Sequence, residues 1–369
     1  MDHFSKFTDI QNTLLEYIEN DDPGEDDNIF KRIIESILTF DNTPDLKTSL
    51  HLIVKISDYH HRSLNFFNKI EKILAKLKKS IIDNYSNIER FIIFQSNKRL
   101  LLYLFKEKII IPDNTIALLL LKDKKIKRNY HYYFFPEFQT FFSQIKQLKS
   151  FNYNEIKSFY TKNSNFFEEN REKGENDNYL NVLIQKDSID EFIQFVNRTN
   201  INLNKKIQPS IFETNLFLLK NEPSIIEYSL FNGSIQIFQY LLFNEVRLER
   251  PFWIYAVQSQ NADLIHLLEQ KKCRFYYPSL YESIKCHHND IANYILNTFN
   301  LKSYEKINDR LLFKCYNFNF LPQEIDFNIS NLFYLCKYDY ISLVDLFLKE
   351  KKIKEEINTK IISIYKNFE

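Results

Sequence analysis

The chain has 369 residues and a formal net charge of +1, from 49 basic and 48 acidic side chains. This length predicts two domains or one elongated array. The balanced charge excludes a generally basic nucleic-acid binder, although it is compatible with a local basic patch. Glycine occurs only at Gly24, Gly174 and Gly233. Phosphate-binding loops and Rossmann-type turns need glycine at positive φ, so both are nearly excluded.

The amino-terminal segment, the apolar runs and the cysteines indicate the compartment. Residues 1–6 lack the basic and then apolar profile of a signal peptide. The longest apolar runs, 100–105 and 116–121, fall far short of the ~20 residues that span a bilayer. The four cysteines form no CxxC pair, which favours a reducing compartment. We therefore expect a cytoplasmic protein without a membrane partner, and a nuclear location stays open as the alternative.

In chain order, the first predicted elements are amphipathic helices, separated by polar breaks at 21–27 and 41–45. Farther along, an apolar stripe with helical spacing consists of Phe66, Ile70, Ile73, Leu74, Leu77 and Ile81. A second stripe, which we interpret as a solvated helix face, consists of Lys69, Lys72, Lys76 and Lys79.

A basic run, 122–128, is followed directly by the aromatic-rich segment 130–135. One interpretation is a charged connection that leads into core aromatics. A second is a nuclear-localisation signal. A third is a basic patch beside aromatics that stack on single-stranded nucleic acid. We favour the first, and the third supplies the alternative function.

The stretch Glu168–Asn178 has no apolar side chain and contains Gly174. We predict a domain boundary there, between a helical N-terminal domain (1–167) and a second domain (179–369). The sequence has no series of alternating strands separated by turn signals. It therefore predicts an all-α fold.

An internal repeat is the clearest pattern in the second half of the chain. Three segments align at a spacing of 27 residues, and a fourth lies 52 residues farther on: Tyr228–Gly233, Tyr255–Gln260, Glu282–His287 and Tyr334–Asp339. A pair of apolar residues follows each segment at a fixed distance: Ile237 and Leu241, Leu264 and Leu268, Ile291 and Ile295, and Leu343 and Phe347. Prolines precede the first three segments, at Pro223, Pro251 and Pro278.

Each repeat is predicted to be a helix hairpin. Proline fits the first turn of a helix, where no backbone N–H is needed. A small residue in the first helix (Ser229, Ala256 or Ser283) then allows close packing on the neighbouring hairpin. A turn follows at the position of Gly233, and the second helix buries the apolar pair. One hairpin cannot bury its apolar face alone but a stack can, so the pattern predicts a helix–turn–helix solenoid.

The segment Ser229–Leu242 resembles the ankyrin repeat, because it largely follows that family's small-small-x-x-Gly-His-x-x-hydrophobic-hydrophobic-x-x-Leu-Leu run. More narrowly, several segments resemble the ankyrin-like proteins expanded in trichomonad protists: Gln208–Glu213, Ile226–Tyr228, Gly233–Gln236, Ile265–Glu269, Ser283–Ala292 and, upstream, Gln95–Arg99. The resemblance implies an ankyrin-like repeat domain in the second half of the chain.

The chain departs from the ankyrin pattern in two ways. Leu230 fills the second small position and Ser234 the position of the turn histidine. The units span 27 residues where ankyrin units span 33, which indicates that the projecting fingers are trimmed. The concave helical face is then the expected partner-binding surface, formed by Phe231, Asn232, Gln258, Ser259, Lys285 and Cys286.

The run Cys286–Asp290 contains residue types that ligate metals or act as nucleophiles. Adjacent side chains on a helix point about 100° apart, however, and no C-x2-C partner completes a tetrahedral site. In the repeat register, His287 replaces the turn glycine and His288 occupies the ankyrin turn-histidine position. We therefore interpret the run as structural.

The leading hypothesis is an ankyrin-like scaffold or adaptor that binds an unidentified protein partner through its concave face. We expect neither enzymatic activity nor a cofactor or metal. The alternative is a nucleic-acid-binding helical solenoid that uses the basic segment 122–128.

Overall fold

The structure is a computed structural model, and it describes residues 2–20, 22–40, 43–59, 65–122, 130–145, 152–248, 252–271, 273, 275–299, 307, 309–321, 328–349 and 355.

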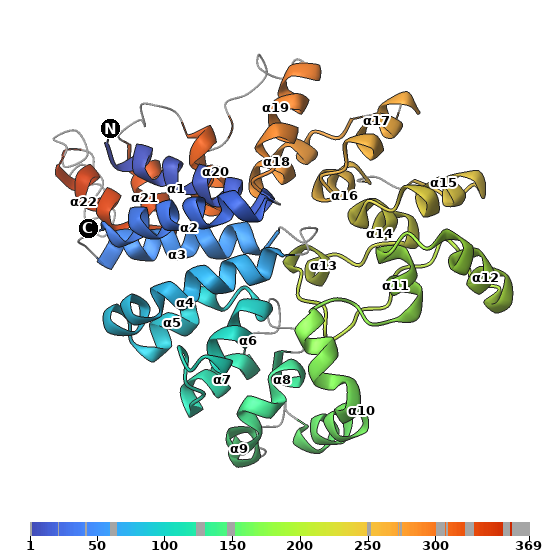
Figure 1. Cartoon of the computed structure of the whole chain (residues 1–369), viewed down its shortest axis with the longest axis horizontal. Helices are drawn as coiled ribbons and strands as arrows, with labels where there is room; N and C mark the ends of the chain where they lie inside the picture. Colours follow the sequence, from blue (N-terminus) through green and yellow to red (C-terminus); the bar gives the residue numbers. More distant parts are fainter. Residues whose placement is uncertain are drawn as a thin grey trace, which may run out of the picture. The chain divides into compact units, whose positions relative to one another are not determined.

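Within these ranges the fold is all-α, as predicted (Figure 1). The described residues contain no β-strand, and their one isolated bridge pairs Lys206 with Ser224. No helix in the described ranges has the length and apolar composition needed to cross a membrane.

The helices of the first half are α1 (Asp2–Glu19), α2 (Pro23–Leu38), α3 (Thr43–Ser57), α4 (Phe66–Asn84), α5 (Asn87–Phe94), α6 (Lys98–Lys106), α7 (Asn114–Lys122), α8 (Tyr130–Tyr133), α9 (Phe135–Ile145) and α10 (Tyr153–Lys173). Those of the second half are α11 (Tyr179–Gln185), α12 (Ile189–Thr199), α13 (Leu216–Lys220), α14 (Ile225–Asn232), α15 (Ile235–Phe243), α16 (Phe252–Gln258), α17 (Ala262–Gln270), α18 (Pro278–Lys285), α19 (Asn289–Thr298), α20 (Asp309–Cys315), the 3-10 turn η2 (Phe318–Phe320), α21 (Ile329–Lys337) and α22 (Ile341–Lys349).

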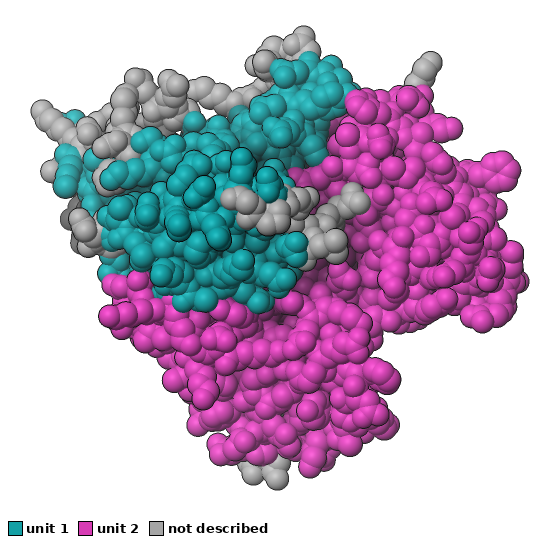
Figure 2. Space-filling view, viewed as in Figure 1, with its two compact units in different colours: residues 1–56, 65–77, 283–369 teal, residues 57–64, 78–282 magenta. Residues whose placement is uncertain are grey.

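Residue contacts divide the chain into two compact units, coloured separately in Figure 2. Unit 1 comprises Met1–Ile56, Asn65–Leu77 and Ser283–Glu369, and unit 2 comprises Ser57–Leu64 and Lys78–Glu282. Divisions fall inside α3, α4 and α18. These bounds differ from the predicted domains 1–167 and 179–369, and residues 168–173 of the expected boundary form the end of α10. Whether 1–167 and 179–369 fold as independent domains stays a prediction.

In unit 1, the first and last parts of the chain pack together. The Gln11 side chain of α1 donates to Asn317 Oδ1 (2.9 Å) and accepts from the Phe318 backbone N–H (2.6 Å). The rings of Phe7 and Phe318 stack with centroids 5.2 Å apart. A contact across some 300 residues leaves no periodic trace in the sequence.

The predicted apolar stripe of α4 is confirmed, since all six of its side chains are fully buried. The predicted solvated stripe is correct for Lys72, Lys76 and Lys79, which are exposed, and wrong for Lys69. The Lys69 ammonium is buried and donates to Tyr17 O (2.7 Å), to Asn20 O and to Asp26 Oδ1 (3.0 Å). Carbonyl and carboxylate oxygens at the end of α1 and the start of α2 replace water around this charge.

Unit 2 contains three consecutive hairpins, α11–α12, α14–α15 and α16–α17. Helix α14 contacts both α11 and α16, and α12 contacts α15 (Figure 1). The small residues Ser229 and Ala256 are fully buried where the first helices meet, as predicted. The apolar residues expected inside the second helices are buried as well, except for Ile291, which is half-exposed beside the buried Ala292 of α19.

The predicted turn positions share one backbone conformation. The φ angle lies in the left-handed region at all four: 72° at Gly233, 51° at Gln260, 60° at His287 and 66° at Asp339. The following N–H closes a six-residue turn onto the first helix in three of them: Ser234 onto Ser229 O (2.9 Å), His288 onto Ser283 O (3.0 Å) and Tyr340 onto Leu335 O (2.9 Å). This is the Schellman ending of a helix, and it confirms the repeat register at these turns.

Further turns with a left-handed residue were not predicted, and two of them follow the first helix of a pair. Asp187, with φ of 49°, ends the first helix of the α11–α12 hairpin, and Tyr316, with φ of 59°, follows α20. Neither residue is glycine, and neither lies at a spacing of 27 residues from its neighbours. Sequence periodicity therefore had no signal for them.

A recurring hydrogen bond joins successive hairpins. In three cases, the side chain after the left-handed residue donates to a carbonyl three residues before the left-handed position of the preceding hairpin. The bonds are Ser234 Oγ to Ile184 O (2.6 Å), Asn317 Nδ2 to Ile284 O (2.8 Å) and Tyr340 Oη to Phe313 O (2.9 Å). Three different side chains fill one geometric role, so the interaction is not visible as a residue motif.

Candidate functional site

The residues predicted to form a concave binding face are mostly buried. Phe231, Gln258, Ser259 and Cys286 are at most 1% exposed, so the prediction that they face solvent is wrong. Asn232 and Lys285 are half-exposed.

The chain itself covers this face in unit 2. Phe217 of α13 stacks on Phe231, with centroids 5.8 Å apart and planes within 3°, and meets Tyr255 edge-on at 5.1 Å. Gln258 Nε2 donates to Glu282 Oε1 (2.7 Å). The segment that leads from α12 to α14 therefore occupies the surface that sequence reasoning left open.

A cavity of about 260 Å³ lies where this segment meets α14. Pro209 and Glu222 are exposed on its rim, and Tyr228 of α14 forms part of its wall. Its full lining is Asn176, Ile207, Pro209, Ser210, Glu213, Leu218, Leu219, Asn221, Glu222, Pro223 and Tyr228.

Backbone pairing holds the segment on the start of α14. The Ile207 N–H donates to Pro223 O (2.8 Å), and the Ile225 N–H donates to Lys205 O (3.1 Å). Ser224 and Glu227 form a capping box that begins α14 and so places Tyr228 one residue farther on. The cavity wall therefore rests on regular helix-capping chemistry.

The end of α10 anchors the other side. Gly174 ends that helix with φ of 69°, and its carbonyl accepts from the Thr214 N–H (3.0 Å) and hydroxyl (2.7 Å). A β-carbon at Gly174 would lie 2.9 Å from Thr214 Oγ1, so the close approach needs glycine. Ser210 Oγ donates to Asp177 Oδ1 (2.6 Å). These bonds hold Glu213, next to Thr214, inside the cavity.

Glu213 is the main charged group of the cavity. Its carboxylate accepts a hydrogen bond from the Asn215 N–H (2.7 Å). Burial raises the pKa of the Glu213 carboxyl to about 7, although that hydrogen bond and the positive charge of Lys98 oppose the increase. Burial also raises the pKa of Tyr228 far above its usual value, so the phenol stays protonated. Its oxygen accepts from Gln185 Nε2 (2.8 Å).

The Lys98 ammonium lies behind the cavity wall and does not line the cavity. It donates to Ile211 O (2.6 Å) and Glu213 O (2.8 Å) and lies 4.5 Å from the centroid of the Tyr133 ring. Burial lowers the pKa of Lys98 to about 7, and the negative charge of Glu213 opposes this decrease. The ammonium thus ties α6 to the segment that carries Glu213.

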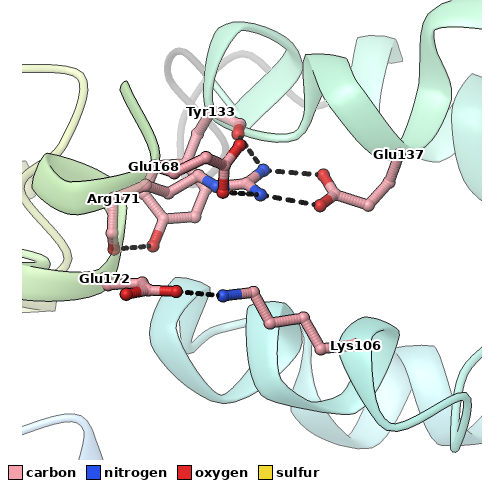
Figure 3. A network of polar contacts seen from close by, with 6 residues as sticks. All are labelled: Lys106, Tyr133, Glu137, Glu168, Arg171 and Glu172. Carbon is pink, nitrogen blue, oxygen red and sulfur yellow. Dashed lines mark hydrogen bonds and ion pairs between the residues drawn. The ribbon is translucent and has the colours of Figure 1, made fainter. Parts of the chain in front are cut away.

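An ion-pair network fixes α10 against α8 and α9 (Figure 3). Arg171 forms two parallel bonds to Glu137, of 2.8 and 2.9 Å, and a third of 2.7 Å to Glu168. The Tyr133 hydroxyl donates to Arg171 O (2.8 Å), and the Arg171 guanidinium donates back to Tyr133 O (3.0 Å). Because Gly174 follows this helix directly, the network also orients the anchor of the cavity.

The basic run 122–128 lies outside the described residues, apart from the backbone of Lys122 at the end of α7. Four of the aromatic side chains after it, Tyr130, Tyr133, Phe134 and Phe135, are fully buried and cannot stack on nucleic-acid bases, whereas Tyr132 is half-exposed. This supports the interpretation of these aromatics as core.

In the Cys286–Asp290 run, the first three side chains are buried and Asp290 is exposed. His287 Nε2 lies 2.8 Å from Cys315 O, and both His287 and His288 are buried. Across the described residues, histidine, cysteine and carboxylate side chains form no group of three that could hold a metal ion. All four cysteines are free thiols.

The sequence did not single out the cavity residues. Gln208–Glu213 contributed only to the ankyrin resemblance, and Tyr228 was treated as a repeat position. The one local signal was a carboxylate between apolar residues, since Glu213 follows Phe212 and precedes Leu216 and Phe217.

No family model, curated protein or solved structure matches this chain. The ankyrin resemblance therefore stands on the residues quoted for it.

Proposed function

We propose that the protein is a non-enzymatic, ankyrin-like scaffold that works in the cytoplasm and binds another protein. The observation that supports this most is the repeated turn register, in which Gly233, Gln260, His287 and Asp339 share one backbone conformation. Hairpins that repeat in this way bury their apolar faces against each other, and such arrays commonly present an extended surface to a macromolecular partner.

The surface differs from the one expected from sequence. Phe231 and Gln258 are covered, so a partner cannot reach the central first helices of unit 2. Beside these covered helices, solvent reaches the cavity rim near Pro209, Leu219 and Glu222. We place the partner contact there, because concave sites with a few convergent polar groups favour binding.

Affinity capture from the native cell with the full chain tests the proposal. The informative variant is Leu219→Trp, which fills the cavity from a half-exposed position, and Gln239→Trp on the exposed face of α15 is its matched control. We expect a protein that is captured by wild type and by Gln239→Trp, and is lost with Leu219→Trp.

The same capture distinguishes the nucleic-acid alternative. A protein partner should survive nuclease treatment, and retention of the chain on a phosphate matrix should be weak at every salt concentration. Nuclease-sensitive capture, with retention that falls steeply as salt rises, would favour nucleic-acid binding, because neutralised phosphates release counterions.

A further inference from the structure

The side chains that line the cavity beside Glu213 favour a positively charged ligand. The ionisable side chains among its described lining residues are Glu213, Glu222 and Tyr228, and none is lysine, arginine or histidine. Much of the remaining wall is aliphatic, from Ile207, Leu218 and Leu219 together with two prolines. A matching ligand carries a positive charge on an aliphatic stem.

The Glu213 carboxylate lacks a contact counter-ion. Within the described part of the chain, its hydrogen bonds come from the backbone of the residues that follow it, chiefly the Asn215 N–H. The nearby Lys98 ammonium donates to backbone carbonyls instead of pairing with this carboxylate. Glu213 is itself only 7% exposed. A buried carboxylate without a paired cation is costly, and a bound cation relieves that cost.

The volume limits the size of the ligand. Sites for drug-sized molecules range from about 300 to 1,000 Å³, whereas this cavity is about 260 Å³. It fits one short aliphatic chain with a charged end. Hydrogen bonds to the carboxylate and to the Tyr228 oxygen match the several N–H donors of an ammonium group.

We infer that the cavity binds an alkylammonium group, with the nitrogen against the Glu213 carboxylate and the stem against Ile207, Leu218 and Leu219. The group is either a free amine or the lysine side chain of another protein. The inference concerns the ligand of this cavity and does not rest on the proposed protein-binding function.

The site should bind more tightly as pH rises. A cation prefers the ionised carboxyl, and Glu213 has a pKa of about 7. Ionisation of this group from pH 6 to pH 8 increases the affinity about tenfold. Lys98, with a pKa of about 7, loses its positive charge over the same pH range, and the nearby Glu175 is a carboxyl that can only become more negative, so neither group opposes the trend. Tyr228 stays protonated throughout.

The test uses the full chain and two probes of equal length, n-butylammonium chloride and 1-butanol, with affinity measured by calorimetry at pH 6 and pH 8. At pH 8, butylammonium should bind at least tenfold more tightly than butanol. At pH 6, butylammonium should bind about tenfold more weakly than it does at pH 8. Equal affinity for the two probes, or no change with pH, would overturn the inference.

Three variants locate the site. Glu213→Gln should weaken butylammonium binding at least tenfold at pH 8 and abolish its pH dependence. Leu219→Trp keeps the carboxylate but fills the cavity, and it should also abolish binding, so the test survives if Glu213→Gln does not fold. Glu191→Gln, an exposed carboxyl of α12, is the control and should bind as wild type does. Unchanged binding in Leu219→Trp would place the amine elsewhere and refute the inference.

Nα-acetyl-lysine methylamide and its norleucine counterpart identify the source. Binding of the lysine compound as well as butylammonium, without binding of the norleucine compound, indicates a protein lysine. Binding of butylammonium without the lysine compound indicates a free amine. Both outcomes support the alkylammonium site, whereas binding of neither amine contradicts it.

Discussion

His287 combines a left-handed backbone with a fully buried imidazole in unit 1. Its Nε2 lies 2.8 Å from Cys315 O. A carbonyl oxygen only accepts, so Nε2 carries a proton. Desolvation by burial lowers the pKa of His287 to about 4. The residue therefore does the work that glycine does at the same turn position, and it adds a bond to the next hairpin.

This histidine should make the protein sensitive to mild acid. In the unfolded chain, His287 is protonated below about pH 6.5, whereas in the folded chain it is protonated only below about pH 4. The free energy of unfolding therefore decreases as the pH falls from 6.5 to 4. One such proton contributes a slope of about 1.4 kcal/mol per pH unit. His287→Asn tolerates the left-handed turn, removes the titration and should lower the slope by about that amount.

Denaturant unfolding at a series of pH values between 6.5 and 4.5 measures this effect. His266→Asn, a change of an exposed histidine in α17, is the matched control and should keep the wild-type slope. Equal slopes for His287→Asn and wild type would show that burial of His287 does not govern the acid response.

At the scale of the helices, close packing between neighbouring hairpins depends on small residues. Ala256 is fully buried in α16, which contacts α14 directly. Gln258, two residues on, is also buried and bonded to Glu282. The two positions therefore differ in chemistry but not in exposure, although the sequence predicted that they would differ in exposure.

The loss of unfolding free energy caused by a substitution should depend on the contact that the new side chain disturbs. Ala256→Leu overpacks the contact with α14 and should cost about 1–3 kcal/mol of unfolding free energy. Gln258→Leu loses a buried hydrogen bond and should cost about 1 kcal/mol. Gln239→Leu, on the exposed face of α15, should change stability by no more than about 0.5 kcal/mol. Denaturant melts check the order, and a Gln258→Leu value equal to that of Gln239→Leu would contradict the burial of this side chain.

At the scale of the whole molecule, the described residues are stabilised by packing between hairpins and by buried ion pairs. No group of metal-binding side chains occurs among them. Incubation with a chelator should therefore leave the melting temperature unchanged. A decrease of several degrees that Zn²⁺ reverses would contradict this, because metal-dependent folds unfold when the metal is removed.

The sequence predicted local features well and long-range ones poorly. The all-α fold, the α4 core stripe and the turns at Gly233, Gln260, His287 and Asp339 were all visible in it, because each depends on neighbours within a few residues or on a regular period. A helical stripe or a turn is a property of a short segment, and its residue types carry the signal.

Tertiary contacts decided which surfaces stay open. Phe217 covers Phe231, and Gln11 pairs with Asn317 about 300 residues away. The cavity around Glu213 likewise depends on the bond between Thr214 and Gly174. Each of these contacts joins segments with different residue types and no common period. A sequence pattern that repeats along one segment cannot specify which distant segment will cover it, so the candidate site emerged only once the chain was folded.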